Sequence, residues 1–576
     1  MKIRPLCTLG SPFGLVRHAI STVLLLGCSQ FAMADGPLRG NPVDAVPTPE
    51  LPAPPPSTPL QTPAPPPSAV QGRAAMQITP KTFNVSGSRS VPFDEVTAIL
   101  EPLAGKPITL GELAQHVSKI TTLYQDYGYP LSFALLQEQD FSNGVVQVTV
   151  VEGYIEAVVI EGEPGRSEAR LNRLAQPLLA EQPLTRRTLE RTLNLMRTVP
   201  GVRISPKLEL PRHESGATTL QLEVSHQPVG ATGSLADMGT GTQGLVSVTA
   251  NSVLGLGEEV NITAAIPTKS DDVRYIAGSV DIPLTVNGLS LTLDGFHYRS
   301  EPRDDALEYI GWERRVTNER IGASLSYPFI LENRRLLKGR VGLYATRTKD
   351  EYHRDLDGAE LTEETHLRVA HAQLEYRHLG TTHSFDGSLG VYKGIDGMGA
   401  RKRLFTNYGI DTKPNYKLDF TRYTANLKHS IQLPANFGLV ASATGQYSSH
   451  ILPSTEQISF GAWRYALGYP QGDMGGDKGY GLSLELNRRF GLNNPYVSSV
   501  QPYISVDHAR AWYNAPHLKP YNDRKLSSAA LGLRLTDDKH YIFDVNVAKP
   551  TGSRPDYNDD RKVRFNTNFS LLYSGL

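Results

Sequence analysis

Cysteine is nearly absent from this 576-residue sequence, which contains only Cys7 and Cys28. Both lie in an N-terminal segment with the features of an export signal, so the exported chain would have no thiol and no disulfide to hold it together. A net charge is also lacking, because 58 Lys and Arg residues balance 58 Asp and Glu residues. The chain as a whole therefore has no field that would attract nucleic acid, and we expect no nucleic-acid partner.

Long apolar runs are missing as well. The apolar run over residues 19–26 is roughly half of the ~20 residues that a transmembrane helix needs. It follows basic residues and precedes the small-x-small sequence AMA at residues 32–34, which is the pattern of a signal-peptide cleavage site. We therefore predict a signal peptide over residues 1–34. The alternative is lipidation of Cys28, because LLGC at that point is similar to a bacterial lipobox.

Proline dominates the next segment, residues 35–76, which includes PELPAPPPSTPLQTPAPPPS. Proline neither donates a ladder hydrogen bond nor continues a helix, so this segment is predicted to be an extended, semi-rigid spacer. The spacer is either an inert tether or a docking segment for a partner or the cell wall.

Two units with the same order of elements follow, over residues 77–153 and 154–227. Each is predicted to contain a strand, two helices and two further strands. In the first unit, Thr109 and Glu112 have the spacing of a capping box at the start of the second helix. The repeated order indicates two small α+β domains.

The hydrophobic period changes to two at about residue 228 and stays so to the C-terminus. Residues 423–433, YTANLKHSIQL, alternate between an apolar and a polar face. Such segments run about ten residues, which is the length of a tilted strand that crosses a bilayer with one face to lipid and one to a polar lumen. A soluble sandwich would have shorter strands and closer turns. We count sixteen segments, an even number as closure of an antiparallel bacterial barrel requires.

A loop rich in glycine and aromatic residues, over residues 450–480, interrupts this series after the eleventh segment. The stretch FGAWRYALGYPQGDMGGDKGYGLSLEL, residues 460–486, begins in this loop and runs into the strand-like segment that follows it. Glycine loses the most conformational freedom on ordering, so a loop of this kind is either floppy or held tightly by close backbone contacts. The aromatic residues favour the second interpretation.

Over residues 77–576 the sequence resembles the outer-membrane transporters of two-partner secretion, also called haemolysin secretion and activation (TpsB) proteins. The order and spacing of several stretches together carry the resemblance: FNVSGS, LYQDYGYPLS, GVVQVTVVEGYIEAVVIEG, LERTLNLMRTVPGV, NSVLGLGEE, SFGAWRYALGYPQGDMGGDKGYGLSLEL and QPYISVDHARAW.

The resemblance implies a mainly β fold, with a C-terminal 16-stranded transmembrane β-barrel (residues 228–576) preceded by two α+β POTRA domains. It implies a monomer in the bacterial outer membrane, with the POTRA domains in the periplasm and lipid around the barrel. The implied partner is a large exoprotein, captured unfolded and passed outward through the barrel. No enzymatic activity, cofactor or metal is implied.

The resemblance also implies that loop 450–480 folds back into the barrel and locks it. Its tip matches the family motif at Gly468 and Tyr469, but the motif arginine is replaced by Leu467. The aspartate expected to pair with that arginine corresponds to Asp507, and a confined carboxylate needs compensation. Arg464 is the nearest candidate for a charge-assisted pair. The alternative is an ordinary extracellular loop with Arg464 on its surface.

Other functions find less support in the sequence. A barrel-assembly insertase of the same superfamily usually has more POTRA domains and the full arginine motif. A passive porin needs no POTRA pair, and a hydrolase needs a catalytic constellation that is missing. The acidic run that includes Asp355, Asp357 and Glu360 lacks the spacing of an EF-hand loop. Many relatives plug the barrel with an N-terminal helix, but the prolines of the spacer make that helix implausible here.

Overall fold

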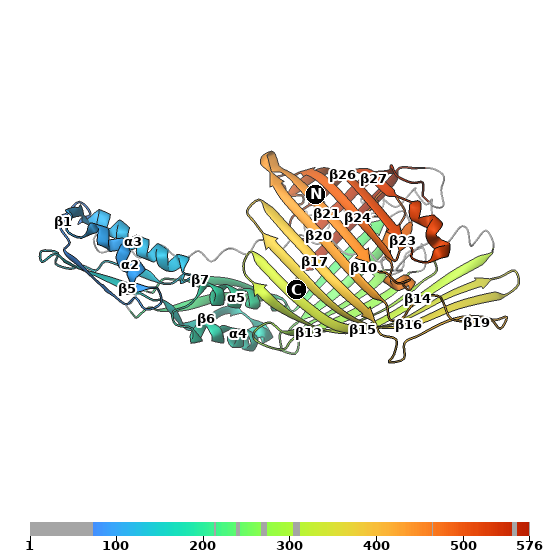
Figure 1. Ribbon diagram of the computed structural model, residues 1–576, viewed down its shortest axis with the longest axis horizontal. Helices are drawn as coiled ribbons and strands as arrows, with labels where there is room; N and C mark the ends of the chain where they lie inside the picture. Colours follow the sequence, from blue (N-terminus) through green and yellow to red (C-terminus); the bar gives the residue numbers. More distant parts are fainter. Residues whose placement is uncertain are drawn as a thin grey trace, which may run out of the picture.

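The computed structural model describes residues 73–211, 215–237, 242–266, 273–302, 311–462, 465–555 and 561–574. The predicted signal peptide, Cys28 and nearly all of the proline-rich spacer lie outside these residues, so the predictions made for them stay predictions. Two small α+β units form an arm that leads to a large β-barrel (Figure 1). None of the helices in the described residues combines the length and the apolar content needed to cross a bilayer.

The first α+β unit has a three-stranded sheet in the order β2-β5-β4, with β2 parallel to β5 and β4 antiparallel to it. The predicted capping box is present, because Thr109 accepts from the Glu112 backbone N–H at 3.2 Å and Glu112 accepts from the Thr109 N–H at 2.9 Å. The elements are β1 (Gln77–Ile78), β2 (Thr82–Ser86), α2 (Phe93–Leu100), η3 (Glu101–Leu103), β3 (Ile108–Thr109), α3 (Leu110–Asp126), β4 (Phe133–Leu135) and β5 (Val145–Val151).

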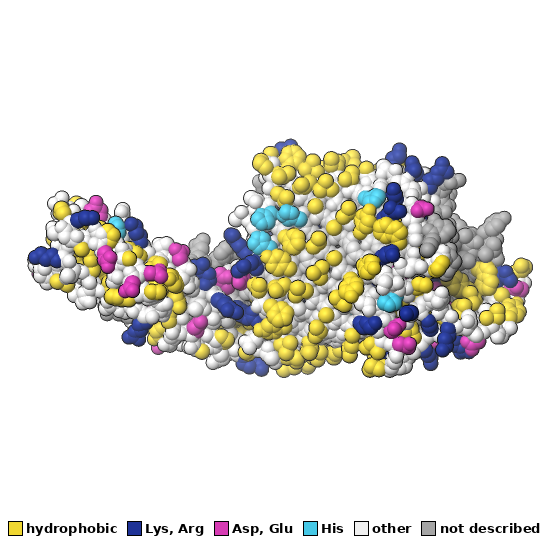
Figure 2. All heavy atoms as spheres, viewed as in Figure 1, with side chains coloured by type: hydrophobic (Ala, Val, Ile, Leu, Met, Phe, Trp, Pro, Cys, Tyr) yellow, Lys and Arg dark blue, Asp and Glu magenta, His cyan; other side chains and the backbone are white. Residues whose placement is uncertain are grey.

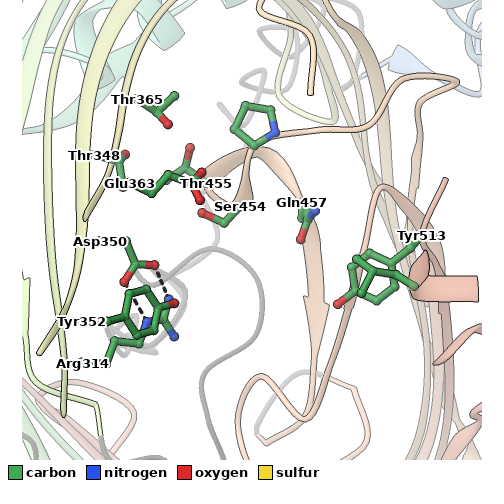
Figure 3. Close-up of a pocket in the computed structure, with 12 residues that line it drawn as sticks. Arg314, Thr348, Asp350, Tyr352, Glu363, Thr365, Ser454, Thr455, Gln457 and Tyr513 are labelled. Carbon is green, nitrogen blue, oxygen red and sulfur yellow. Dashed lines mark hydrogen bonds and ion pairs between the residues drawn. The ribbon is translucent and has the colours of Figure 1, made fainter. Parts of the chain in front are cut away.

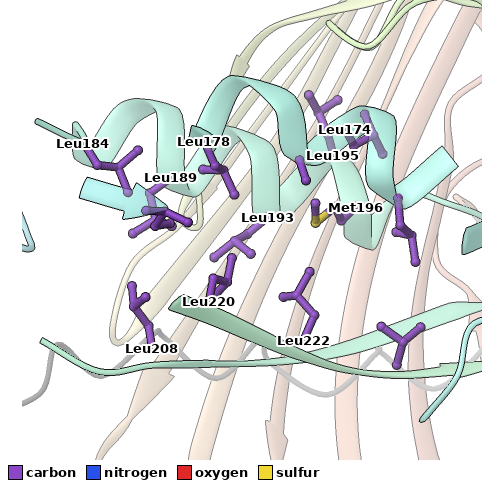
Figure 4. Close-up of a cluster of buried hydrophobic side chains, with 14 of the residues drawn as sticks. Leu174, Leu178, Leu184, Leu189, Leu193, Leu195, Met196, Leu208, Leu220 and Leu222 are labelled. Carbon is purple, nitrogen blue, oxygen red and sulfur yellow. The ribbon is translucent and has the colours of Figure 1, made fainter. Parts of the chain in front are cut away.

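The second α+β unit repeats this topology, with sheet order β6-β8-β7. Leucines of α4 and α5 form one core with Leu220 and Leu222 of β8 (Figure 4). The predicted order of a strand, two helices and two strands is therefore confirmed in both units. The elements are β6 (Tyr154–Glu163), η4 (Gly165–Ser167), α4 (Glu168–Ala180), α5 (Arg186–Arg197), β7 (Val202–Leu208) and β8 (Ala217–His226).

The barrel is closed and antiparallel, and its last strand pairs with its first. Sixteen long strands in the described residues make up the wall, as the sequence predicts. They are β9 (Val229–Asp237), β10 (Thr242–Asn251), β11 (Glu259–Ile266), β12 (Arg274–Pro283), β13 (Ser290–Ser300), β14 (Trp312–Leu331), β15 (Arg335–Arg354), β16 (Ala359–Leu379), β17 (His383–Gly394), β20 (Thr421–Leu433), β21 (Phe437–Tyr447), β24 (Lys478–Arg488), β26 (Ser499–Trp512), β27 (Leu526–Thr536), β28 (Tyr541–Pro550) and β29 (Arg564–Ser574).

Short elements complete the barrel region. Strands β18 (Arg401–Thr406) and β19 (Asp411–Thr412) extend the wall beyond β16, and β25 (Phe490–Gly491) pairs with β26. The others are η5 (Pro434–Asn436), η6 (Ser454–Glu456), β22 (Ile458–Phe460), β23 (Met474–Gly476) and η7 (Pro516–Asp523).

The outer face of the barrel carries an apolar band (Figure 2). On β24, the outward row reads Lys478, Tyr480, Leu482, Leu484, Leu486 and Arg488, and the three leucines are 47%, 46% and 37% exposed. The two cations are ten residues apart. At about 3.3 Å per residue and a tilt of about 40°, this spacing corresponds to roughly 25 Å, the height of the apolar band of an outer-membrane barrel.

The second α+β unit contacts the turns at one end of the barrel. The Arg170 guanidinium donates to the Thr285 carbonyl at 2.6 Å, and Arg191 donates to the carbonyls of Asn287 and Pro328 at 2.9 and 3.0 Å. Val286 and Leu331 also pack against the core of the unit. The arm is thus fixed to the end of the barrel at which the chain enters β9.

Candidate functional site

Residues 448–477, hereafter the inner loop, connect β21 to β24, which are the eleventh and twelfth strands of the barrel wall. The loop contacts the lumen side of the wall. On β26, Ile504 and Val506 are 55% and 54% exposed toward lipid, whereas Tyr503 and Asp507, which alternate with them, are 4% and 7% exposed. Since the loop contacts Asp507, it lies inside the barrel.

The inner loop contains a hairpin in which β22 and β23 pair, and the segment between these two strands is the loop tip. Inside the tip, the Ala462 N–H donates to the Tyr469 carbonyl and the Tyr469 N–H donates to the Ala466 carbonyl, both at 2.9 Å. Gly461 has a φ of 126°, and a Cβ there would lie 1.8 Å from the Pro470 carbonyl oxygen. Only glycine fits such a position, which accounts for one costly residue of the predicted loop.

Asp507 is the residue of the barrel wall that binds the loop tip. Its Oδ2 accepts from the Leu467 backbone N–H at 3.0 Å. Its Oδ1 accepts from the backbone N–H and the hydroxyl of Ser528, at 3.0 and 2.6 Å. A carboxylate that accepts several hydrogen bonds keeps its charge at a lower desolvation cost. Backbone amides therefore provide part of the compensation that the sequence assigns to an arginine.

Gly468 and Tyr469 continue the contact with the wall. The Gly468 N–H donates to the Ser528 hydroxyl at 3.1 Å, and a Cβ on Gly468 would lie 2.7 Å from the Pro550 nitrogen. Tyr469 is fully buried, and its hydroxyl donates to the Ser553 carbonyl at 2.8 Å. The structure thus brings together four of the five predicted residues: Leu467, Gly468, Tyr469 and Asp507. Arg464 lies outside the described residues, so its pairing with Asp507 stays a prediction.

A buried ion pair anchors the start of the inner loop, and sequence reasoning missed it. Glu456 is 4% exposed and pairs with Arg422 of β20 at 2.8 Å. The Tyr344 hydroxyl donates to the same carboxylate at 2.9 Å, and the Arg422 guanidinium lies 4.0 Å from the centre of the Tyr392 ring. The alternation of β20 puts Arg422 on the polar face, but no sequence signal pairs it with a residue of the loop.

The return segment of the inner loop has two further anchors. Asp473 pairs with Arg524 at 2.6 Å, and Arg524 also donates to the Asp473 carbonyl at 2.7 Å. The Asp477 carboxylate accepts from the backbone N–H groups of Leu452 and Asn514, at 2.8 and 2.7 Å. The loop is therefore held at its start by Arg422 of β20 and Tyr344 of β15, and at its tip and return by β26, β27 and the segment between them.

A polar cavity of about 290 Å³ remains between the inner loop and strands β14–β16. Arg314 and Asp350, paired at 2.6 Å, face Ser454 and Thr455 of the loop across it (Figure 3). Its lining lacks a nucleophile with an adjacent base, and the described residues contain no group of three or more His, Cys, Asp or Glu side chains that could hold a metal.

Two family models match the chain. Residues 78–153 match the POTRA domain of ShlB type, and residues 216–535 match the haemolysin secretion/activation protein family ShlB/FhaC/HecB.

Curated relatives match over most of their length. The heme/hemopexin transporter protein HuxB of Haemophilus influenzae (strain 86-028NP) is 22% identical over 82% of this chain and 83% of its own. The outer membrane transporter CdiB of Escherichia coli is 25% identical over 82% of this chain and 78% of its own.

Solved structures share the fold. CdiB from Escherichia coli superposes with a TM-score of 0.66 at 21% identity and covers 90% of this chain and 94% of its own. BamA from Haemophilus ducreyi, lacking POTRA domains 1–3, has a TM-score of 0.55 at 14% identity, over 86% of this chain and 100% of its own.

Proposed function

Because this chain belongs to the haemolysin secretion/activation family ShlB/FhaC/HecB, we propose that the inner loop is the lock of a protein-export channel. The chain is an outer-membrane transporter of two-partner secretion, which passes a partner exoprotein across the outer membrane. Its POTRA region lies in the periplasm and its barrel spans the membrane. What stays a proposal is how this chain blocks the lumen and receives its partner.

The contact between Leu467 and Asp507 carries the proposal of a lock. An extended polypeptide needs a continuous path through the lumen, and the inner loop crosses that path while its tip is bound to β26 and β27. The tip must therefore leave Asp507, or rearrange on it, for each export event. We include Arg464 in the lock, with Leu467, Gly468, Tyr469 and Asp507, as a second donor to the Asp507 carboxylate.

The two α+β units are proposed to be POTRA domains that receive the unfolded partner. In each sheet the central strand is the last in sequence, so the edges are β2 and β4 in the first unit and β6 and β7 in the second. An extended segment can add as a strand to such an edge. Phe93 and Tyr127 of the first unit are 52% and 45% exposed and offer apolar contacts beside the sheet. We also propose that the chain works as a monomer and that it catalyses no reaction.

A disulfide that ties the loop to the wall tests the lock. Cys7 and Cys28 both lie in the predicted signal peptide, so introduced cysteines would be the only thiols of the exported chain. Leu467→Cys with Asn566→Cys places one thiol on the loop tip and one on the neighbouring strand β29, whose Asn566 side-chain amide donates to the Leu467 backbone carbonyl at 3.2 Å. Export of a co-expressed partner exoprotein should stop when the bond forms and resume on reduction, and each single variant is the control. Undiminished export by the crosslinked transporter would rule out a lock at this position.

Deletion of residues 77–153 tests the proposed receiving role of the first unit. The barrel should still reach the outer membrane in a heat-modifiable form, because its wall closes without this unit. Secretion of the partner should be lost. Normal secretion by the deletion variant would show that capture takes place elsewhere, and loss of the heat-modifiable form would show that the unit is needed for assembly instead.

A further inference from the structure

Four cations lie at the ends of neighbouring strands, on the side of the barrel opposite the α+β units. They are Lys478 at the start of β24, Arg510 near the end of β26, Lys525 just before β27 and Lys549 near the end of β28. Hereafter these four residues are the outer cation cluster. Figure 2 shows Lys and Arg side chains gathered at this end of the barrel, beside the apolar band.

All four side chains point away from the lumen. On β26, the lumen-facing Ala509 and Ala511 are buried, so Arg510 between them faces outward. On β28, Ala548 is buried and Val547 is 45% exposed, which places Lys549 on the outer face. The strand alternation does the same for Lys478, which stands next to the lumen-facing Asp477, and for Lys525, which precedes the buried Leu526.

The cluster lies on the border of the apolar band. Directly below it on the same face are Leu482 and Leu484 of β24, Val506 of β26 and Leu531 of β27, each between 46% and 64% exposed. Two aromatic residues mark the border itself, since Tyr480 and Trp512 have ring centres 5.8 Å apart, and the Arg510 guanidinium lies 4.9 Å from the Trp512 ring. Aromatic residues of this kind sit at the headgroup level of a membrane.

No described carboxylate forms an ion pair with any member of the cluster. On the far side of the same rim, by contrast, three cations have carboxylate partners: Arg347 pairs with Glu364 at 3.3 Å, Lys349 with Glu351 at 2.6 Å and Arg403 with Asp411 at 2.8 Å. In addition, the buried Nε of Arg510 has no hydrogen-bond partner among the described residues. The cluster therefore has positive charge left for an anion from outside the chain.

We propose that the outer cation cluster binds the phosphate groups of lipid A, the phosphorylated glycolipid of the outer leaflet. Its cations lie on four neighbouring strands, each about 4.8 Å from the next, and Lys549 is also offset along its strand because it pairs opposite Ala529, four residues beyond Lys525. The row is therefore wide enough for more than one phosphate. Guanidinium and ammonium groups form charge-assisted hydrogen bonds with phosphate oxygens, and the acyl chains would pack on the leucines below. An acidic peptide would use the charges but leave the apolar border and the aromatic pair unused.

Binding at this place would also stiffen the wall that holds the inner loop. The backbone of Trp512 accepts from the Asp477 N–H at 2.9 Å, and Gly468 of the loop tip packs against the backbone of Lys549 and Pro550. The proposed lipid site and the wall residues that contact the inner loop thus lie on the same strands, on opposite faces of the wall.

The full-length transporter, purified in detergent and stripped of lipid, allows a direct test by native mass spectrometry with diphosphorylated lipid A. The variant Arg510→Gln/Lys525→Gln/Lys549→Gln should bind at least tenfold more weakly than the parent. The control Arg488→Gln/Arg489→Gln/Lys539→Gln removes three cations at the opposite border, of which Arg489 is paired with Asp538 at 2.6 Å, and should bind as the parent does. Dephosphorylated lipid A should bind weakly to all three proteins, and all three should stay heat-modifiable.

Several outcomes would overturn the proposal. Unchanged lipid A binding by the cluster variant would show that these cations do not form the site. Equal binding of dephosphorylated lipid A would show that the contact is only apolar. Equal binding of phosphatidylglycerol would show a general anionic-lipid surface, and binding of an acidic peptide in place of lipid A would point to a polypeptide ligand.

Discussion

The backbone N–H of Leu467 donates to Oδ2 of Asp507 at 3.0 Å, across the gap between the inner loop and the barrel wall. In the motif typical of this family, the residue at the position of Leu467 is an arginine, and its charge is expected to face the aspartate that corresponds to Asp507. Here an amide dipole of the loop backbone makes the contact, assisted by Ser528. The wall contact therefore survives the loss of the arginine side chain, with less direct charge compensation.

Asp507→Asn should weaken the binding of the loop tip to the barrel wall. The new amide group cannot accept from the Leu467 N–H and from both Ser528 donors, so one donor faces another at a cost of about 1–3 kcal/mol. We expect more frequent opening events in planar-bilayer conductance recordings. Asp386→Asn is the control, because Asp386 pairs with Arg377 on the wall and makes no described contact with the loop. Identical recordings for both variants would show that the Asp507 charge does not hold the loop.

Arg464→Ala should impair secretion or make conductance erratic if the Arg464 guanidinium is the second partner of Asp507. Arg464→Lys keeps the charge and should restore most of the function, whereas Arg464→Gln should not. Because Asp507 already accepts from Leu467 and Ser528, we expect the effect of Arg464→Ala to be smaller than that of Asp507→Ala. Normal secretion by Arg464→Ala would exclude the pair.

Gly468→Ala should lift the loop tip off the wall. The added Cβ would meet the backbone of Lys549 and Pro550 at 2.7–2.8 Å, and backbone atoms cannot give way as the end of a side chain can. Overpacking of this kind typically costs about 1–3 kcal/mol, and we expect higher open-channel conductance and greater entry of large antibiotics. Gly491→Ala serves as the control, since a Cβ there would meet nothing within 4 Å.

Glu456→Gln should release the start of the loop from β20. It leaves the Arg422 charge enclosed without its counter-ion, which costs about 3–5 kcal/mol where desolvation is complete and less where lumen water reaches the site. The inner loop should become more accessible to added protease in intact outer membranes. The double variant Glu456→Gln/Arg422→Gln removes both charges and should recover part of the protection; equal cleavage of the single variant and the parent would contradict an anchoring role.

Arg191→Ala should loosen the arm from the barrel without unfolding either part. It removes the donors to the carbonyls of Asn287 and Pro328, which cross between α5 and the barrel turns. We expect reduced secretion with an unchanged heat-modifiable barrel, because the partner would no longer be delivered to a fixed entrance. Arg187→Ala on the same helix removes an exposed arginine and should secrete normally.

Local patterns carried most of the fold prediction. The hydrophobic period of two predicted the sixteen strands, because each strand has lipid on one face and water on the other. The spacing of Thr109 and Glu112 predicted the capping box. The resemblance indicated the residues of the loop tip. The pair of Glu456 with Arg422 and the contacts of Arg191 with the turns escaped prediction, since they join residues that are distant in sequence and depend on how the barrel closes.

The unequal lengths of the wall strands shape the exit of the barrel. Strands β14, β15 and β16 have 20, 20 and 21 residues, whereas β24 has 11. At about 3.3 Å per residue and a tilt of about 40°, the difference is roughly 23 Å of height. The wall is thus tall and charged on the side of β14–β16, and it ends close to the lipid surface on the side of β24. A chain that leaves the lumen is expected to turn toward the low side of the wall at β24, so that its first folded segment forms beside the membrane.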